Sequence, residues 1–99
     1  MNTESCDMRR VAVRPWSAWD LKVGEFFTST DKDGQRWLVA MFPGGNLAHL
    51  PLRPLLKPEI CGGQSWQFDG NEVKPTLTPS VHAVGSWHGW VTAGRMVSC

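Results

Sequence analysis

A chain of 99 residues has room for one domain with its own hydrophobic core, and too few residues for a second. Hydrophobic residues make up 41% of it and charged residues 19%, which is typical of a folded domain rather than of a disordered segment. Ten basic and nine acidic side chains leave a formal net charge of +1, so no overall charge attracts the protein to nucleic acid or to an anionic membrane.

Membrane insertion and secretion find no support in the sequence. No apolar run approaches the roughly 18 residues of a membrane span, and the polar N-terminus lacks the apolar core of a secretory signal. Cys6, Cys61 and Cys99 are odd in number and widely separated, which fits reduced thiols better than a disulfide framework. We therefore expect a cytoplasmic protein that has no membrane partner.

The first half of the chain is predicted to form strands. Residues 1–9 are polar and without a pattern, so we expect them to be loose and assign a single domain to residues 10–99. Basic and apolar residues alternate over 10–14, as in an edge strand. Two apolar runs, 25–29 and 35–42, flank an Asp- and Gly-containing turn and predict a hairpin.

The second half continues this pattern after a proline-rich interruption. Three prolines make residues 51–63 a predicted surface loop. Short strands are then expected in the following ranges: 65–68, 80–84, 87–92 and 95–99. Residues 75–80 are expected to be extended, because their two prolines favour β or polyproline conformations. Six to eight short strands predict an all-β or β-rich single domain, built as a small antiparallel sandwich or an open barrel.

The last third of the chain carries a recognisable series of motifs. They are Trp66, Asp69-Gly70-Asn71, Lys74-Pro75-Thr76-Leu77-Thr78-Pro79-Ser80-Val81, Trp87-His88-Gly89-Trp90, Gly94 and Val97-Ser98-Cys99. In this order they resemble a family of short, uncharacterised phage and prophage proteins. The resemblance implies a small β-rich domain and a phage or mobile-element origin.

The resemblance also implies a metal site in many relatives, where two knuckles supply a tetrahedral zinc set. Their Cys-Pro-x-Cys turn falls at Phe42 to Gly45 of this chain, and their Cys-x-x-His at Gly85 to His88. Only His88 matches, so the resemblance implies that this member has lost the zinc, and we expect no cofactor. The residues that could form a substitute zinc site are Cys61, His82, His88 and Cys99.

Catalytic motifs are missing from the sequence. There is no Gly-x-Ser-x-Gly, no phosphate-binding Gly-rich loop with a Lys-Ser or Lys-Thr pair, and no Gly-x-Gly-x-x-Gly. Ser86 and His88, two positions apart on a strand, could share a face as a nucleophile and base, but such pairs are common by chance. The sequence therefore predicts that the protein is not an enzyme.

Tryptophan is the residue type in surplus, with six copies. Trp37 and Trp66 lie within strand patterns and are expected in the core. Trp87 and Trp90 are three apart on a predicted strand and must point to opposite faces, so one of them should be exposed, as interface anchors often are. The predicted partner-binding residues are Trp87, His88, Trp90 and, on the loop, Leu55, Leu56 and Ile60.

These observations favour a phage or mobile-element accessory protein that binds a host bacterial protein and inhibits a defence system such as CRISPR. Two alternatives stay open. One is a nucleic-acid-binding module, which would use exposed tryptophans beside Arg9, Arg10, Arg14, Arg36 and Lys74. The other is a small metal-binding structural protein. Either a monomer or a dimer formed through an edge strand would be consistent with the pattern.

Overall fold

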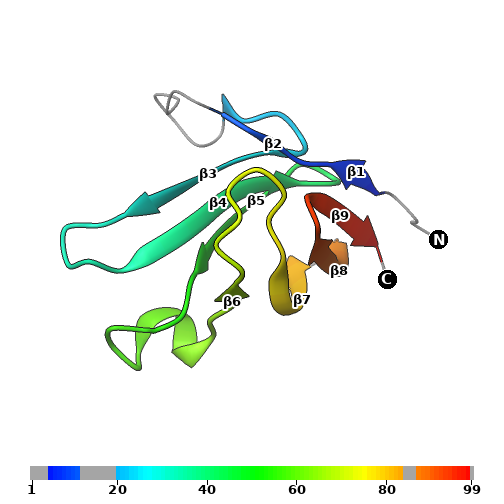
Figure 1. The fold of residues 1–99 in the computed structure, drawn as a ribbon. Coiled ribbons are helices and arrows are strands. Elements are labelled where there is room, and N and C mark those ends of the chain that lie inside the picture. Colours follow the sequence, from blue (N-terminus) through cyan, green and yellow to red (C-terminus); the bar gives the residue numbers. More distant parts are fainter. Residues whose placement is uncertain (1–4, 12–19, 84–86, 99) are drawn as a thin grey trace.

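The structure, a computed structural model, describes residues 5–11, 20–83 and 87–98. Within these ranges the chain forms nine strands arranged in two sheets (Figure 1). No helix in the described ranges is long and apolar enough to cross a membrane.

The four-stranded sheet has the order β2 (Arg9–Arg10), β3 (Glu25–Thr30), β4 (Arg36–Phe42), β5 (Asn46–Pro51). β2 runs parallel to β3, and the other neighbours are antiparallel. The β3–β4 hairpin is closed at Asp31, whose Oδ1 accepts the backbone N–H groups of Asp33 and Gln35 at 2.9 and 3.0 Å. Its Oδ2 accepts the indole N–H of Trp37 at 3.0 Å, and this bond lowers the pKa of Asp31 below its ordinary value.

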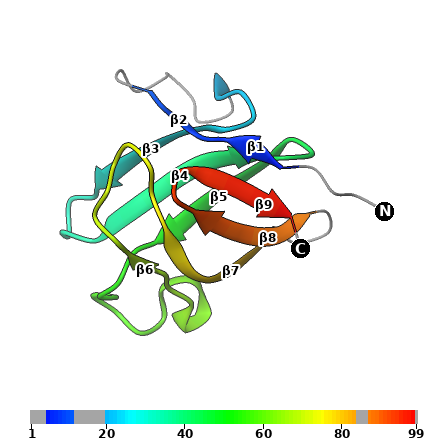
Figure 2. The ribbon, with the colours of Figure 1, turned by 45° about the vertical axis from the view of Figure 1, so that its right-hand side comes forward.

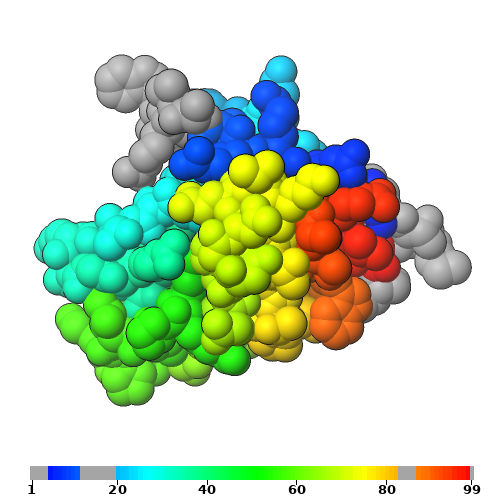
Figure 3. All heavy atoms as spheres, in the orientation of Figure 1, coloured from blue at the N-terminus to red at the C-terminus, as the bar shows by residue number. Residues whose placement is uncertain are grey.

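The five-stranded sheet has the order β1 (Cys6–Asp7), β9 (Arg95–Ser98), β8 (Trp87–Thr92), β7 (Leu77–Ala83), β6 (Gln67–Phe68), and all its pairs are antiparallel. Figure 2 shows this sheet in front of the other, and in Figure 3 the spheres of β7, β8 and β9 form neighbouring yellow, orange and red bands. A two-residue turn joins β8 to β9. Its residues Ala93 and Gly94 both have positive φ, of 48° and 80°, as a tight hairpin turn of this kind requires.

The main core lies between the sheets. From the four-stranded sheet it takes Phe26, Leu38, Ala40, Phe42 and Leu50, and from the five-stranded sheet Leu77, Val81, Trp87, Val91 and Met96. Met8, Leu52 and Trp66 complete it. Alternation along β8, with every second side chain buried, is what directs one face of that strand to this core and the other to solvent.

A second, smaller cluster covers the opposite face of the four-stranded sheet. It contains Leu21, Phe27, Val39 and Met41. Because β4 is thus covered on both faces, the run from Leu38 to Phe42 is buried without interruption.

The two sheets meet at one edge through the segment that follows β5. Leu52 and Trp66 form an isolated parallel bridge, in which the N–H of Trp66 donates to the carbonyl of Pro51 at 3.0 Å and the N–H of Arg53 donates to the carbonyl of Trp66 at 2.9 Å. Beneath it, the fully buried Gln35 side chain donates to the carbonyl of Leu52 at 2.9 Å and accepts the N–H of Leu56 at 2.9 Å. These bonds fix the loop that leads to the short 3₁₀ turn η2 (Ile60–Gly63).

The predicted β-rich single domain is confirmed, as two packed sheets; the described strands do not close into a barrel. Pairing starts earlier than residue 10, because Cys6 and Asp7 lie beside β9. The predicted loop 51–63 begins later than expected, since Pro51 and Leu52 are buried core residues. The predicted strand 10–14 falls largely outside the described residues, of which only Arg10 and Val11 belong to it.

Candidate functional site

A serine and a histidine meet on the solvent-facing side of the five-stranded sheet. The Oγ atom of Ser80, on β7, lies 3.2 Å from Nε2 of His88, on β8. Ser80 is half-buried and His88 is exposed. A serine and a histidine within hydrogen-bond reach have the geometry that a covalent hydrolytic mechanism requires of its nucleophile and general base, in which Nε2 accepts the hydroxyl proton.

Ser80 lies in an irregular part of β7. Leu77 pairs with Val91 and Val81 pairs with Gly89, so β7 advances four residues where β8 advances two, and the register shifts between them. Leu77 and Val81 both remain buried. The extra residues of β7 therefore lie between two anchored core positions, and such bulges commonly re-aim a side chain beside an active site.

A second histidine lies against the pair. His82 and His88 are direct cross-strand partners, and their ring centroids are 5.0 Å apart with a tilt of 38° between the planes. His82 shares its face of β7 with Ser80 because the two are separated by two positions. The three side chains Ser80, His82 and His88 thus form one cluster, which we call the Ser–His–His cluster.

Two tryptophans are tied to this cluster in different ways. Trp90 follows His88 on the same exposed face of β8 and is 46% exposed. Trp66 lies in the core and donates its indole N–H to the backbone carbonyl of Ser80 at 3.3 Å. This second contact holds the backbone of the serine from the side opposite β8.

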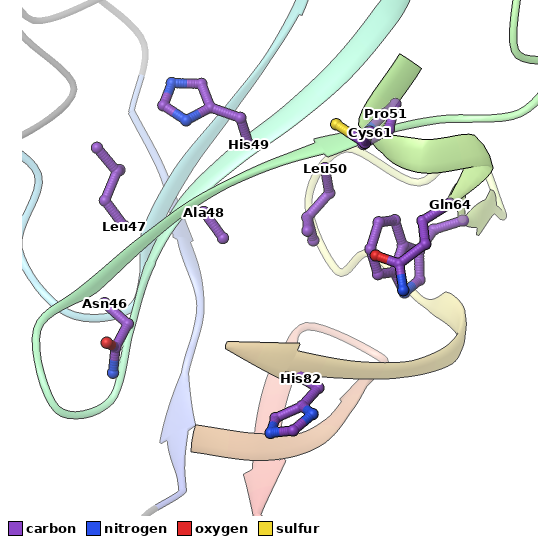
Figure 4. Close-up of a pocket in the computed structure, with 10 residues that line it drawn as sticks. Asn46, Leu47, Ala48, His49, Leu50, Pro51, Cys61, Gln64 and His82 are labelled. Atoms are coloured by element: carbon purple, nitrogen blue, oxygen red, sulfur yellow. The ribbon is translucent and has the colours of Figure 1, made fainter. Parts of the chain in front are cut away.

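A hollow of about 350 Å³ adjoins the cluster. Its walls come from β5, from His82 on β7, and from Cys61, Gln64 and Trp66 in the segment before β6 (Figure 4). His82 and Trp66 therefore belong both to the hollow and to the surroundings of Ser80. We call this hollow the β5–β7 groove.

The structure separates the two tryptophans that were predicted as partner-binding residues. The prediction of opposite faces is correct, since Trp90 is exposed whereas Trp87 is 1% exposed and packs on Phe42 at a centroid distance of 5.1 Å. Trp87 is therefore a core residue and offers no surface to a partner. His88 lies in the Ser–His–His cluster, while Leu56, which is 48% exposed, lies on the separate loop with the partly exposed Leu55 and Ile60.

The residues of the predicted substitute zinc site do not converge as a set. His82 and His88 are adjacent, and Cys61 lines the groove with His82, but in the described part of the chain no three His, Cys, Asp or Glu residues come together as metal ligands would. Cys99 lies outside the described residues.

The serine that the sequence pairs with His88 is a different one, Ser86. Ser86 lies outside the described residues, whereas the serine that contacts His88 is Ser80, eight positions earlier. The available signal was Ser80 and His82 on one strand face, two positions apart, followed by a turn and His88. Their contact across the hairpin depends on the register that places His82 opposite His88, and the pattern of apolar residues does not reveal this register.

Comparison with known families matches residues 13–99 to the family model described as bacterial ubiquitination-like system serine protease (BubE). No curated protein and no solved structure matches the chain. The family match overturns three predictions: that the protein is not an enzyme, that it is a phage accessory protein binding a host protein, and that it inhibits a defence system such as CRISPR. Because the match covers most of the chain, and because the structure joins a serine to a histidine within it, we conclude that the chain belongs to the BubE family of bacterial ubiquitination-like system serine proteases.

Proposed function

We propose that the protein is a serine protease of a bacterial ubiquitination-like system, with Ser80 as its nucleophile and His88 as its general base. The observation that carries the assignment is the 3.2 Å separation of Ser80 Oγ and His88 Nε2. The family match supports the reaction class, and the contact between Ser80 and His88 supports these two residues as the reacting pair.

The reaction follows from the chemistry of the two groups. The Oγ atom of Ser80 attacks the carbonyl carbon of the scissile bond while its proton passes to Nε2 of His88. The carbon–nitrogen bond then breaks, and His88 returns the proton to the leaving amine, which leaves an acyl group on Ser80. A water molecule attacks this ester, with His88 as base, and releases the carboxylic acid and the free serine.

The sheet gives this pair a rigid support. Ser80 is held by the Trp66 bond to its carbonyl and by Val81, whose side chain is 1% exposed. His88 stands between Trp87 and Gly89, which both face the core. Sites built on strands hold their geometry better than sites built on loops, so the free protein is already arranged for attack.

A fluorophosphonate probe tests the assignment, because it reacts covalently with an activated serine hydroxyl. We expect labelling of the wild-type protein at Ser80, located by mass spectrometry of the digested protein. Ser80→Ala should abolish labelling, and His88→Ala should slow it by about 10²–10⁴-fold, the usual contribution of a general base. The matched control is Ser29→Ala, which removes a hydroxyl from β3 in the other sheet.

Two results would contradict the assignment. Labelling of Ser80→Ala at the wild-type rate would exclude Ser80 as the nucleophile. Labelling found at Ser86 in the wild-type protein would assign the nucleophile to the serine two positions before His88 in the sequence.

Location in the bacterial cytoplasm stays part of this proposal. It is supported by the wide spacing of the three cysteines, which suits a reducing compartment.

A further inference from the structure

The β5–β7 groove lies between two strand edges. β5 is the last strand of its sheet, and within the described residues its outer edge is paired only from Pro51 onward, at the Leu52–Trp66 bridge. β7 pairs with β6 only at Leu77 and Thr78, so from Pro79 onward the described chain places no strand beside that edge. The hollow between these two edges reaches from Asn46 to Pro51 along β5.

Backbone hydrogen-bonding groups of β5 face this groove. The N–H of Leu52 donates to the carbonyl of Arg36, so the hydrogen-bonded pairs with β4 continue at Leu50, Ala48 and Asn46. In an antiparallel ladder the residues between them turn their N–H and carbonyl groups the other way. The backbone groups of Leu47 and His49 therefore point out of the sheet toward the groove.

The β7 wall offers matching groups. The carbonyl of Ser80 points away from β8, because it accepts the indole N–H of Trp66. Since successive residues of a strand alternate, Val81 directs its backbone groups to β8 and His82 directs its own toward the groove. A chain lying in the groove would therefore meet backbone donors and acceptors on both sides.

The side chains lining the groove limit what fits. Ala48 and Leu50 point from β5 toward β7, whereas Leu47 and His49 point away (Figure 4). Trp66 closes one end by its bonds to Pro51 and Arg53. A volume of about 350 Å³ is near the lower end of ligand pockets, about 300–1,000 Å³, so the groove takes a short segment with small or medium apolar side chains.

We propose that the β5–β7 groove binds an extended peptide segment of the substrate as an added strand on β5, and so presents the scissile carbonyl to Ser80. This proposal rests on the proposed function of the Ser–His–His cluster. Strand addition suits the groove because an extended chain satisfies the outward-facing groups of Leu47 and His49, and its alternate side chains contact Ala48 and Leu50. His82 connects the groove to the reacting pair, since it lines the groove and its ring lies against that of His88.

The substitution His49→Pro tests the proposal by removing one backbone N–H group of β5. The N–H of His49 points away from β4, so His49→Pro removes a donor to the groove without removing a bond between β4 and β5, and proline is tolerated at such edge positions. His49→Ala is the matched control, because it removes the same side chain and keeps the N–H.

The assay measures cleavage of a library of unstructured peptides by mass spectrometry and, separately, the rate of labelling of Ser80 by the small fluorophosphonate. We expect His49→Pro to cut peptides about tenfold more slowly than His49→Ala, the effect of one lost hydrogen bond, while both variants keep the wild-type labelling rate within about twofold. Equal cleavage by both variants would overturn the groove as the peptide site.

A second measurement uses the wild-type protein and so does not depend on the folding of a variant. Peptides that are cleaved are resynthesised with a single N-methyl group at each backbone position in turn. Strand addition predicts that methylation blocks cleavage at alternate positions, and uniform tolerance would overturn it. If the wild-type protein is not labelled by the fluorophosphonate at all, the proposed function itself is rejected.

Discussion

Gly89 lies on β8 between His88 and Trp90, and replacing it with alanine tests whether the core beneath the Ser–His–His cluster has any free space. Its φ is outside the left-handed region, so alanine is compatible with the backbone itself. An added Cβ would overlap the carbonyl oxygen of Val97 and lie 2.6 and 2.7 Å from Cζ2 and Cη2 of Trp87. Real Cβ atoms essentially never approach other atoms so closely.

Neither neighbour can move aside freely. The Val97 carbonyl belongs to β9, where Gly89 pairs with Ser98, so relief there means separating β8 from β9. The indole of Trp87 is 1% exposed and in contact with Phe42. We therefore expect a cost of about 3 kcal/mol, the upper end of the range of about 1–3 kcal/mol for overpacked cores.

Urea denaturation and thermal unfolding measure this cost. In a domain of this size about 1 kcal/mol lowers Tm by roughly 4–8 °C, so Gly89→Ala should lower it by roughly 12–24 °C. Gly45→Ala is the control for adding a methyl group where there is no overlap, because nothing lies within 4 Å of the new atom. The φ of Gly45 is +81°, so this substitution costs only the left-handed backbone strain of about 1–2 kcal/mol. The reasoning fails if Gly89→Ala is within about 0.5 kcal/mol of the wild type, the ordinary range of surface substitutions.

Two more predictions concern the β3–β4 hairpin and its neighbours. Gln35→Leu removes a buried side chain that both donates and accepts, and the loss of its partner at the N–H of Leu56 should lower the free energy of unfolding by about 1–3 kcal/mol in urea denaturation; an unchanged midpoint would contradict the role assigned to it. Trp37→Phe removes the indole N–H that lowers the pKa of Asp31, so that pKa should rise toward its ordinary value of 3.8, as followed by NMR of the carboxyl group. A carboxyl group whose pKa is lower in the folded state stabilises the protein at pH values above its unfolded pKa, and this stabilisation is lost as the pH falls through the folded pKa. The wild type should therefore lose more stability than the variant as the pH falls below 3.8. Identical dependence of stability on pH in the two proteins would refute this.

Local patterns were sufficient to predict the hairpins of this fold. Asp31 and Gly34 marked the β3–β4 turn, and Ala93-Gly94 marked the turn between β8 and β9. The spacing of Trp87 and Trp90 was enough to assign them to opposite faces. Each of these features is decided by residues close together in the sequence, where turn chemistry and the two-residue period of a strand apply directly.

Long-range pairing could not be predicted in the same way. β1 is a strand only because it lies beside β9, almost 90 residues later in the chain, and nothing in its own two residues indicates this. The site has the same origin: Ser80 meets His88 because the register of β7 against β8 places His82 opposite His88, which makes Ser80 a diagonal neighbour of His88 on the same face. Spacing along the sequence therefore pointed to Ser86 as a partner of His88, and it did not indicate the contact with Ser80 across the hairpin.

The slipped register of β7 also means that the residues between Leu77 and Val81 do not have to pair one for one with β8, whereas Leu77 and Val81 both pair with β8 and pack in the core. Leu77 and Val81 thus keep the sheet anchored to the core. The serine therefore follows two residues, Thr78 and Pro79, that can change in sequence while the pairing with β8 on either side persists. Variation that tunes the surroundings of Ser80 is expected to accumulate at Thr78 and Pro79, and variation at the two anchors to be limited to other apolar residues of similar volume.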